Sequence, residues 1–369
     1  MQTKINFNAG PAQMPPEVLH EAAIAVRKYK KTGSSILELP HRGKEFLEIM
    51  EESKALVKKL CGIDDDYDVM WLQGGGRMQF CMIPMNFLSA GKAAGFIDSG
   101  YWAGDAAKYA AYYGDAKVLA SSKESNYNHL PEWPEIPKQL AYLHIATNNT
   151  IYGTQWHKIP KTSVPLIADM SSDIFSANRD YSQYAMFYAA VQKNLGAAGL
   201  ALAVVRKDMM KRMTNTMPPM LSYKETAREN SILNTPNVFG IYISLLMLRW
   251  IDGKGIAAIE DENKRKADLL YSTLDSSSLF TPHVKGKAHR SLMNVCFTAN
   301  TPEVEKSFLA HCEENDITGV KGHRLAGGFR VSLYNAISLE EVEIFVSLMK
   351  KFEQQITEPA NPVRAKWSR

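Results

Sequence analysis

The sequence has few cysteines, no long apolar run and little net charge. Its 369 residues include only four cysteines, and no two form a CxxC pair, which argues against a disulfide framework and against structural zinc. No apolar run approaches the roughly 18 residues of a membrane helix, and nothing near the first residue is typical of a signal peptide. A net charge of +4 over this length does not indicate nucleic-acid binding. We therefore expect a cytoplasmic protein.

What remains is the composition of a globular α/β protein. Hydrophobic residues make up 45% and charged residues 22% of the chain, both close to the average of folded proteins. The length suits about two domains of roughly 100–200 residues each. Short apolar runs end in polar turns and alternate with helical patterns. This alternation predicts a mostly parallel sheet with helices on both faces, followed by a smaller α+β domain in the last third of the chain.

The segment from Val164 to Arg206 places an acid and an amine at the ends of two short apolar runs. Asp169 ends the first run, and Lys193 follows the second, 24 residues later. Such runs indicate buried strands, and ligands of α/β sheets gather at the carboxyl ends of strands. A buried ion needs a partner or a chemical role. One role that fits is a Schiff base between Lys193 and pyridoxal phosphate, with Asp169 holding the pyridine nitrogen protonated. A solvated strand end is the alternative.

Two further strand ends carry residues suited to such a cofactor. Residues 69–72 form an apolar run that leads into three glycines, residues 74–76, and Arg77. Glycines let backbone amides approach a phosphate, and the next helix would direct its N-terminal dipole at it. The pattern is neither GxGxxG nor a Walker loop, and a plain tight turn explains it equally well. Trp102 follows another strand-like run; it suits stacking on a planar ring, although ordinary packing is the commoner role.

Basic residues form two candidate anion sites. His41 and Arg42 lie in a loop between two helical patterns, and His323 and Arg324 precede a pair of glycines. Solvated basic loops are the common explanation of such stretches. Arg330 lies on a strand that begins directly after the glycine pair. A guanidinium fixed on a strand is well suited to hold a carboxylate through two hydrogen bonds.

Eight motifs, in order, give the sequence a resemblance to a known family. The chain is similar to the phosphoserine aminotransferases, which are class-V enzymes of the aspartate aminotransferase fold type I. The motifs span residues 6–336. Eight motifs in the same order identify a family far more specifically than one motif alone. They are NFNAGP (6–11), HRGKEF (41–46), GGGRMQF (74–80), DSGYWA (98–103), ADMSSD (168–173), QKNLGAAGL (192–200), SILNTP (231–236) and KGHRLAGGFRVSLYNA (321–336).

The resemblance implies a fold, a cofactor and an assembly. The fold would be a large domain, residues 16–260, with a mostly parallel seven-stranded sheet flanked by helices. A small α+β domain would comprise residues 261–369, with residues 1–15 contributing to it. The cofactor would be pyridoxal 5'-phosphate, no metal would be needed, and two copies of the chain would form a homodimer with shared active sites.

The resemblance also implies a role for each cofactor-binding residue. Lys193 would hold the cofactor and then carry protons as general base and acid, and Asp169 would pair with the ring nitrogen. Trp102 would stack on the ring, and Thr150 would bond its phenolic oxygen. The remaining residues would bind the cofactor phosphate, the last two of them from the second subunit: Gly76, Arg77, Gln192, Asn234 and Thr235.

The implied activity is the reversible transamination of 3-phosphohydroxypyruvate with glutamate, which gives O-phospho-L-serine and 2-oxoglutarate in serine biosynthesis. The family also processes a phosphohydroxythreonine during pyridoxal phosphate biosynthesis. Arg330 would bind the substrate carboxylate. His323 and Arg324, with His41 and Arg42 of the partner chain, would bind the substrate phosphate.

Two alternatives remain at this point. One is another fold-type I enzyme, such as an alanine–glyoxylate aminotransferase, which needs no phosphate-binding cluster, or a cysteine desulfurase, which needs a reactive cysteine in a mobile loop. The other is a scaffold that keeps the fold without activity. Two departures from the family pattern are also present. Ala9 replaces a serine found in some relatives, and the tail from Ile356 to Arg369 matches nothing in the family, so that no role is assigned to it.

Overall fold

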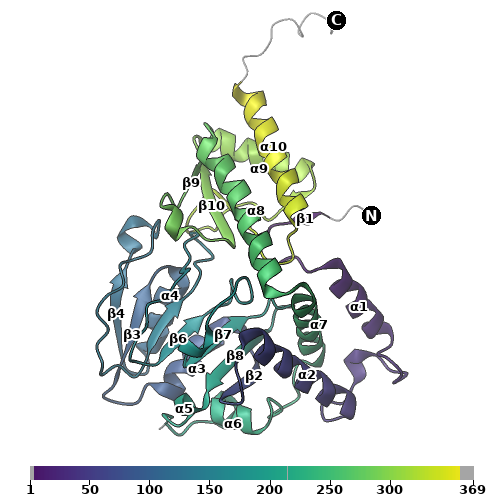
Figure 1. Ribbon diagram of the computed structural model, residues 1–369, viewed down its shortest axis with the longest axis vertical. Coiled ribbons are helices and arrows are strands. Elements are labelled where there is room, and N and C mark those ends of the chain that lie inside the picture. Colours follow the sequence, from purple (N-terminus) through teal and green to yellow (C-terminus); the bar gives the residue numbers. More distant parts are fainter. Residues whose placement is uncertain (1–3, 214, 358–369) are drawn as a thin grey trace, which may run out of the picture.

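One seven-stranded sheet forms the centre of the molecule (Figure 1). The computed structural model describes residues 4–213 and 215–357, so the unassigned tail lies outside the described residues from position 358 onward. The strands in spatial order are β2 (Tyr67–Gln73), β8 (Leu200–Arg206), β7 (Met186–Ala190), β6 (Leu166–Asp169), β5 (Leu143–Ala146), β3 (Ala93–Asp98) and β4 (Asp115–Ser121). All neighbours are parallel except β8, which runs antiparallel to both β2 and β7. The predicted mostly parallel sheet is confirmed.

Helices cover both faces of this sheet because both faces of its inner strands are apolar. On one face, side chains such as Trp71 and Phe187 pack against α1 (Pro16–Arg27), α2 (Lys44–Cys61) and α7 (Val238–Lys254). On the other face, side chains such as Met70 and Tyr188 pack against α3 (Gly75–Phe87) and α4 (Tyr101–Ala110). The short helices α5 (Lys207–Met210) and α6 (Tyr223–Arg228) complete that second layer. Burial on both faces explains why the strands are continuous apolar runs.

A second core lies beyond the sheet. It is built from the antiparallel strands β9 (Phe280–Pro282), β10 (Asn294–Ala299) and β12 (Phe329–Ser332), together with helices α8 (Ile256–Ser276), α9 (Pro302–Glu314) and α10 (Leu339–Thr357). The N-terminal segment joins it, because β1 (Ile5–Asn6) pairs with β11 (Ile317–Thr318) and Phe7 is buried in this core.

Helix α8 connects the two cores. Its Ile259 packs in the core of the large sheet, whereas Ala267 and later residues pack in the second core. Figure 1 shows the helix running from the sheet towards α9 and α10. The division of the chain at residue 260 therefore stays a prediction, since one continuous helix belongs to both cores.

The direction of the strands brings several loops to one edge of the sheet. Strands β2, β3, β5, β6 and β7 all run the same way, and β8 begins at the edge where they end. Polar residues that follow these strands must therefore lie close together. No helix among residues 4–213 and 215–357 is long and apolar enough to cross a membrane.

Candidate active site

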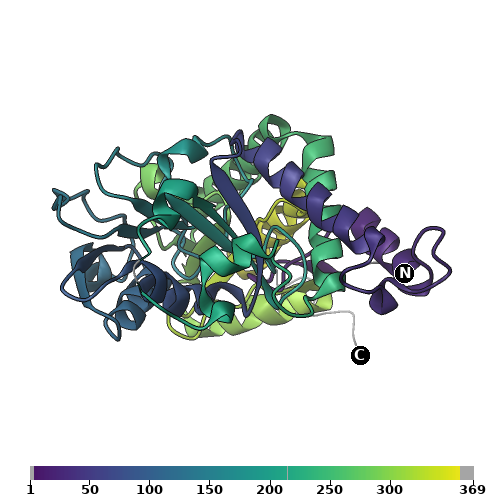
Figure 2. The ribbon, with the colours of Figure 1, turned by 90° about the horizontal axis from the view of Figure 1, so that it is seen from below.

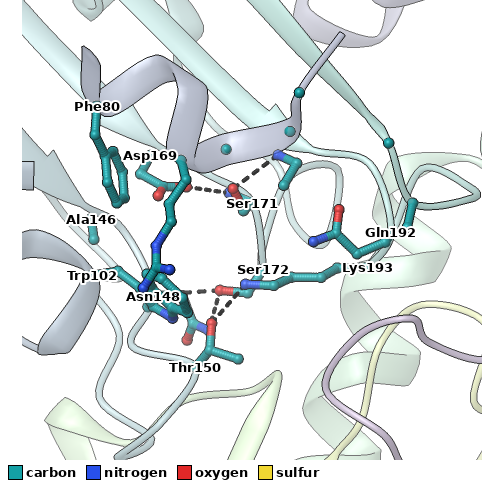
Figure 3. Close-up of a pocket in the computed structure, with 17 residues that line it drawn as sticks. Phe80, Trp102, Ala146, Asn148, Thr150, Asp169, Ser171, Ser172, Gln192 and Lys193 are labelled. Carbon is teal, nitrogen blue, oxygen red and sulfur yellow. Dashed lines mark hydrogen bonds between the residues drawn. The ribbon is translucent and has the colours of Figure 1, made fainter. Parts of the chain in front are cut away.

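A pocket of about 390 Å³ opens at the carboxyl edge of the central strands (Figure 3). It lies between the first turn of α3, the start of α4 and the loops that follow β5, β6 and β7. Seven of the residues predicted to bind a cofactor line it: Gly76, Arg77, Trp102, Thr150, Asp169, Gln192 and Lys193. The chain thus brings together seven positions that span more than a hundred residues of sequence.

Lys193 extends into this pocket and meets Thr150. Its Nζ atom donates a hydrogen bond to Thr150 Oγ1 at 2.8 Å, and Figure 3 shows the two side chains pointing at each other. Burial lowers the pKa of Lys193 to about 8; the charge of Asp169 opposes this shift, and Arg330 adds to it. A lysine with such a pKa carries a substantial neutral fraction near neutral pH, and a neutral amine is the nucleophilic form.

Asp169 ends β6 and faces the same pocket. Its Oδ1 accepts a hydrogen bond from the backbone N–H of Ser171 at 2.9 Å, which fixes the carboxyl group at the strand end. Burial raises the pKa of Asp169, and the neighbouring Lys193 opposes that rise. The site therefore holds an acid and an amine that modify each other's proton affinity at the end of the sheet.

The first turn of α3 offers backbone donors to the pocket. Gly74, with φ of 94°, caps the helix without a side-chain hydrogen bond, and Gly75 follows with φ of 68°. These positive φ values favour glycine at both positions. Gly76 packs so closely that an added Cβ would lie 3.3 Å from the Cβ of Ala190. The amides at the start of this 13-residue helix are suited to bind an anion.

Trp102 forms the aromatic wall of the pocket. Its ring lies 6.4 Å from that of Phe80 at an interplanar angle of 49°. The Arg77 guanidinium lies 5.1 Å from the ring centroid of Trp102 and within 3.4 Å of the Asp105 carboxylate. These contacts hold the indole at the wall of the pocket, and the Arg77 side chain leans across its face towards Asp105.

The N-terminal turn supports the base of the pocket, a role that the sequence analysis did not assign to it. The Ala12 amide donates to the Gln192 carbonyl at 2.9 Å, and an added Cβ on Gly10 would lie 3.3 Å from Gln192 Cγ and 3.4 Å from Lys193 Cγ. The Tyr334 hydroxyl donates to the Ala9 carbonyl at 2.9 Å. The NFNAGP motif was the available signal, since a glycine and a proline in one short turn suit such close packing.

Arg330 reaches the pocket from the second core. Its Nη1 donates to the Thr150 carbonyl at 3.3 Å, and its Nε is buried with no hydrogen-bond partner among the described residues. Burial lowers the pKa of His323, and the charges of Arg330 and Arg324 lower it further. The three predicted substrate-binding residues of this segment therefore lie near one another, with two guanidinium groups close to a largely neutral His323, and Arg330 also lies near Lys193.

Four predicted site residues lie away from the pocket of Lys193 in the same chain. Asn234 and Thr235 are exposed, and each accepts a hydrogen bond from Gln73 Nε2 at 3.3 Å. They do not line the pocket of Lys193. His41 and Arg42 lie before α2, in an N-terminal segment that projects from the body (Figures 1 and 2). One copy of the chain does not bring these four residues to Lys193.

The chemistry of the pocket fits pyridoxal phosphate. An amine, a carboxylate, an aromatic ring and the open amides of a helix N-terminus face one cavity. The Gln192 side chain lines the same cavity, where its amide N–H groups can donate to an anion. These are the groups that hold the aldehyde, the ring nitrogen, the ring face and the phosphate of this cofactor.

Comparison with known proteins identifies the family. The aminotransferase class-V family matches residues 5–345. Phosphoserine aminotransferase of Geobacillus kaustophilus is 43% identical over 359 residues, which cover 96% of this chain and 99% of that protein. The crystal structure of phosphoserine aminotransferase from Bacillus circulans subsp. alkalophilus is 40% identical with a TM-score of 0.94, over 96% of this chain and 100% of that one.

The chain belongs to the phosphoserine aminotransferase family. A structure of this family with pyridoxal phosphate bound, from Trichomonas vaginalis, is 31% identical with a TM-score of 0.90, and the match covers 94% of this chain and 99% of that chain. The predictions of family, fold type and aminotransferase class are confirmed. Because class-V aminotransferases work with pyridoxal phosphate, the predicted cofactor is confirmed at the level of the family.

Proposed function

We propose that this protein transfers an amino group reversibly between glutamate and 3-phosphohydroxypyruvate, with O-phospho-L-serine and 2-oxoglutarate as products. The observation that carries the proposal is the pair of guanidinium groups, Arg324 and Arg330, that lies around His323 beside the pocket of Lys193. A substrate with a carboxylate and a phosphate needs two anion sites next to the reacting amine. Relatives of 41–43% identity that bear the name phosphoserine aminotransferase support the assignment.

Residues of this chain would bind the phosphate, the ring face and the phenolic oxygen of the cofactor. The amides of Gly76 and Arg77 and the side chain of Gln192 would bind its phosphate. Trp102 would cover one face of its ring, and Thr150 would contact its phenolic oxygen. When bound, the cofactor supplies an aldehyde that accepts the amino group and a ring that withdraws electrons from the substrate Cα.

Lys193 and Asp169 would control the protons. Lys193, released when the substrate amine takes its place, would remove the proton from the substrate Cα at Nζ and return it to the carbon on the other side of the transferred nitrogen. Its lowered pKa, about 8, makes the neutral form available for that step. Asp169 would keep a proton on the ring nitrogen, because a carboxylate beside the nitrogen favours the protonated form.

Arg330 would hold the substrate α-carboxylate. Its Nε is buried and has no hydrogen-bond partner among the described residues. Its Nη1 donates to the carbonyl of Thr150, the residue whose hydroxyl accepts from Lys193. Two parallel N–H donors of a guanidinium match the two oxygens of a carboxylate. His323 and Arg324 would bind the distal anion, which is the phosphate of phosphoserine or the side-chain carboxylate of glutamate.

We also propose that two copies of the chain complete each site. Asn234, Thr235, His41 and Arg42 are predicted to contribute from a partner, and none of them lines the pocket of their own chain. The projecting N-terminal elements carry large exposed apolar side chains, which include Leu19, Leu37 and Leu47 at 47%, 60% and 38% exposure. Exposed apolar groups gathered on neighbouring elements favour burial against another copy.

The cellular location proposed for this activity is the cytoplasm. All four cysteines are free, and Cys61, Cys296 and Cys312 are buried among the described residues. Unpaired buried cysteines suit a reducing compartment.

The test of the proposed function is a full reaction with the purified protein and pyridoxal phosphate. Glutamate and 3-phosphohydroxypyruvate are mixed with it, and O-phosphoserine and 2-oxoglutarate are measured by mass spectrometry. Pyruvate, glyoxylate and oxaloacetate serve as competing acceptors, and Lys264→Ala, at an exposed lysine, serves as the control variant. We expect turnover only with the phosphorylated acceptor. Equal turnover with pyruvate or glyoxylate would refute the proposal.

A further inference from the structure

A buried tyrosine and a buried histidine lie directly behind Asp169. Strand β6 runs between β5 and β7, and the register pairs Asp169 with Ala146 on one side and with Tyr188 on the other. His144 lies two residues before Ala146 on β5, so its side chain is on the same face of the sheet as those of Asp169 and Tyr188. Tyr188 is 0% and His144 2% exposed. Neither side chain lines the pocket of Lys193.

The two side chains are joined to each other across β6. His144 Nε2 and the Tyr188 hydroxyl lie 2.9 Å apart, and their ring centroids are 6.0 Å apart at an interplanar angle of 33°. The His144 ring also packs at 5.5 Å from Phe96. A polar pair in such a setting is costly to bury unless it is satisfied or has a role.

The direction of the hydrogen bonds follows from the partners available. Burial lowers the pKa of His144 to about 3, so its imidazole is neutral and carries one proton. His144 Nδ1 has no partner among the residues that the structure describes, whereas Nε2 faces the Tyr188 oxygen. A proton on Nδ1 would be an unpaired buried donor, so the proton belongs on Nε2, which donates to Tyr188.

The Tyr188 hydroxyl then has its own proton available for another acceptor, and the strand register places Asp169 beside Tyr188 on the same face of the sheet. Burial raises the pKa of Tyr188 far above its usual value, and the charge of the neighbouring Asp169 adds to that rise. The hydroxyl therefore keeps its proton. The other charged groups near Asp169 are Lys193 and Asp173, and the other titratable groups near Tyr188 are Tyr142 and Tyr223.

We propose that His144 and Tyr188 are positioning residues that direct two hydrogen bonds in series at Asp169 and keep its carboxylate ionised and oriented towards the cofactor ring nitrogen. The inference rests on the proposed function for the role of Asp169, but it concerns residues that touch neither cofactor nor substrate. A hydrogen bond to the charged form of a carboxylate opposes the effect of burial. The two hydrogen bonds in series thus lower the pKa of Asp169 and oppose the effect of burial, which raises it.

The test measures the pKa of Asp169 in the cofactor-free protein. Infrared spectra of protein that contains 13C-labelled aspartate are recorded against pH, and Asp169→Asn identifies the band of the Asp169 carboxyl. In Tyr188→Phe we expect the pKa of Asp169 to rise by about one unit, the size expected for one lost hydrogen bond to a charged group. The same variant should weaken cofactor binding and alter the pH dependence of the visible absorbance once the protein is loaded.

Tyr142→Phe is the matched control. Tyr142 is 0% exposed, its ring packs on Phe96 as His144 does, and its hydroxyl has no partner among the described residues. Removing that hydroxyl should leave the pKa of Asp169 unchanged. An unchanged Asp169 pKa in Tyr188→Phe, or an equal shift in both variants, would overturn the proposal.

Substitutions at His144 keep the test decisive if Tyr188→Phe fails to fold. His144→Gln retains an N–H donor and should leave the pKa of Asp169 close to that of the unchanged protein, whereas His144→Leu should raise it. Equal values in these two variants would contradict the series. Because these measurements need no cofactor, they separate the two claims: a protein without transaminase activity would refute the proposed function and leave the Asp169 result standing.

Discussion

Asn335 and Asn194 connect the two cores beside Lys193. The backbone N–H of Asn335 donates to Asn194 Oδ1 at 3.1 Å, and Asn335 Nδ2 donates to the Phe175 carbonyl at 3.0 Å. Asn263, on α8, donates to Asn335 Oδ1 at 3.0 Å. These buried amides fix the segment that follows β12, the strand of Arg330, against the residue that follows Lys193. The distance between the carboxylate-binding and reacting groups therefore depends on this network.

Asn335→Ala should lower both stability and substrate affinity. The substitution leaves the Phe175 carbonyl without a side-chain donor and removes one of the two hydrogen bonds of the Asn263 amide, which costs about 2 kcal/mol of unfolding free energy. We expect KM for O-phosphoserine to rise more than kcat falls, since the change loosens the position of Arg330 rather than the proton transfer. Urea unfolding and steady-state kinetics measure both. The exposed Asn300, changed to Ala, is the control; equal effects in both variants would contradict this account.

The pKa of Lys193 predicts how cofactor attachment depends on pH. The neutral amine is the reactive form, and burial lowers the pKa to about 8. The rate at which pyridoxal phosphate attaches to cofactor-free protein should therefore rise with pH, reach half of its maximum near pH 8 and level off above that pH. Stopped-flow absorbance measures that rate, with a small lysine derivative of pKa about 10.4 as the reference amine. A rate that keeps rising to pH 10, as the reference does, would show that the lysine is not perturbed.

Mixing two inactive variants tests whether sites are shared between chains. Lys193→Ala and Arg42→Ala, unfolded together and refolded, should form hybrid dimers in which one site has both defects and the other has none. Half of the dimers are hybrids, so activity should recover to about a quarter of that of the unchanged protein.

The control for this mixing experiment pairs Lys193→Ala with Arg330→Ala. Both residues are expected to serve the site of their own chain, so every site of the hybrid retains one defect and no activity should return. No recovery with Arg42→Ala would place Arg42 in the site of its own chain and contradict the proposed sharing. Recovery in the control would place Arg330 and Lys193 of one chain in different sites and contradict the proposed carboxylate site.

Arg330→Lys should show that geometry, not charge alone, binds the carboxylate. Lysine keeps the positive charge but loses the planar pair of donors. Loss of these charge-assisted bonds should reduce kcat/KM for O-phosphoserine about 100-fold. Arg265→Lys, at an exposed position on α8, is the control. A reduction of less than about threefold in Arg330→Lys would remove Arg330 from the carboxylate site.

Most of the sheet was predictable because its strands are buried on both faces. The apolar runs at residues 164–168 and 200–205 correspond to β6 and β8 within two residues at each end. Strand β4 was not predicted, and its exposure explains why: this outer strand has no fully buried residue, and its apolar run is only three residues long, from Val118 to Ala120.

The residues predicted to contact the cofactor could be found in the sequence, but the buried residues that hold them in place could not. Lys193 and Asp169 stand out because charged residues end apolar runs. His144 and Tyr188 lie within such runs, where the sequence gives no sign that they face each other across β6. Their pairing depends on the order of the strands, which places β6 between β5 and β7. The proposed contribution of Asn234 and His41 would come from a second copy of the chain, which the fold of one copy does not contain.

The most direct test of the central claim is a half-reaction with a single amino donor. Protein loaded with pyridoxal phosphate is mixed with O-phosphoserine alone, and the visible absorbance of the bound cofactor is followed; serine, alanine and aspartate are mixed in parallel. The account predicts rapid loss of absorbance with O-phosphoserine, slow or no loss with the other three, and recovery when 2-oxoglutarate is added. Equal loss with alanine would contradict the phosphate site formed by His323 and Arg324.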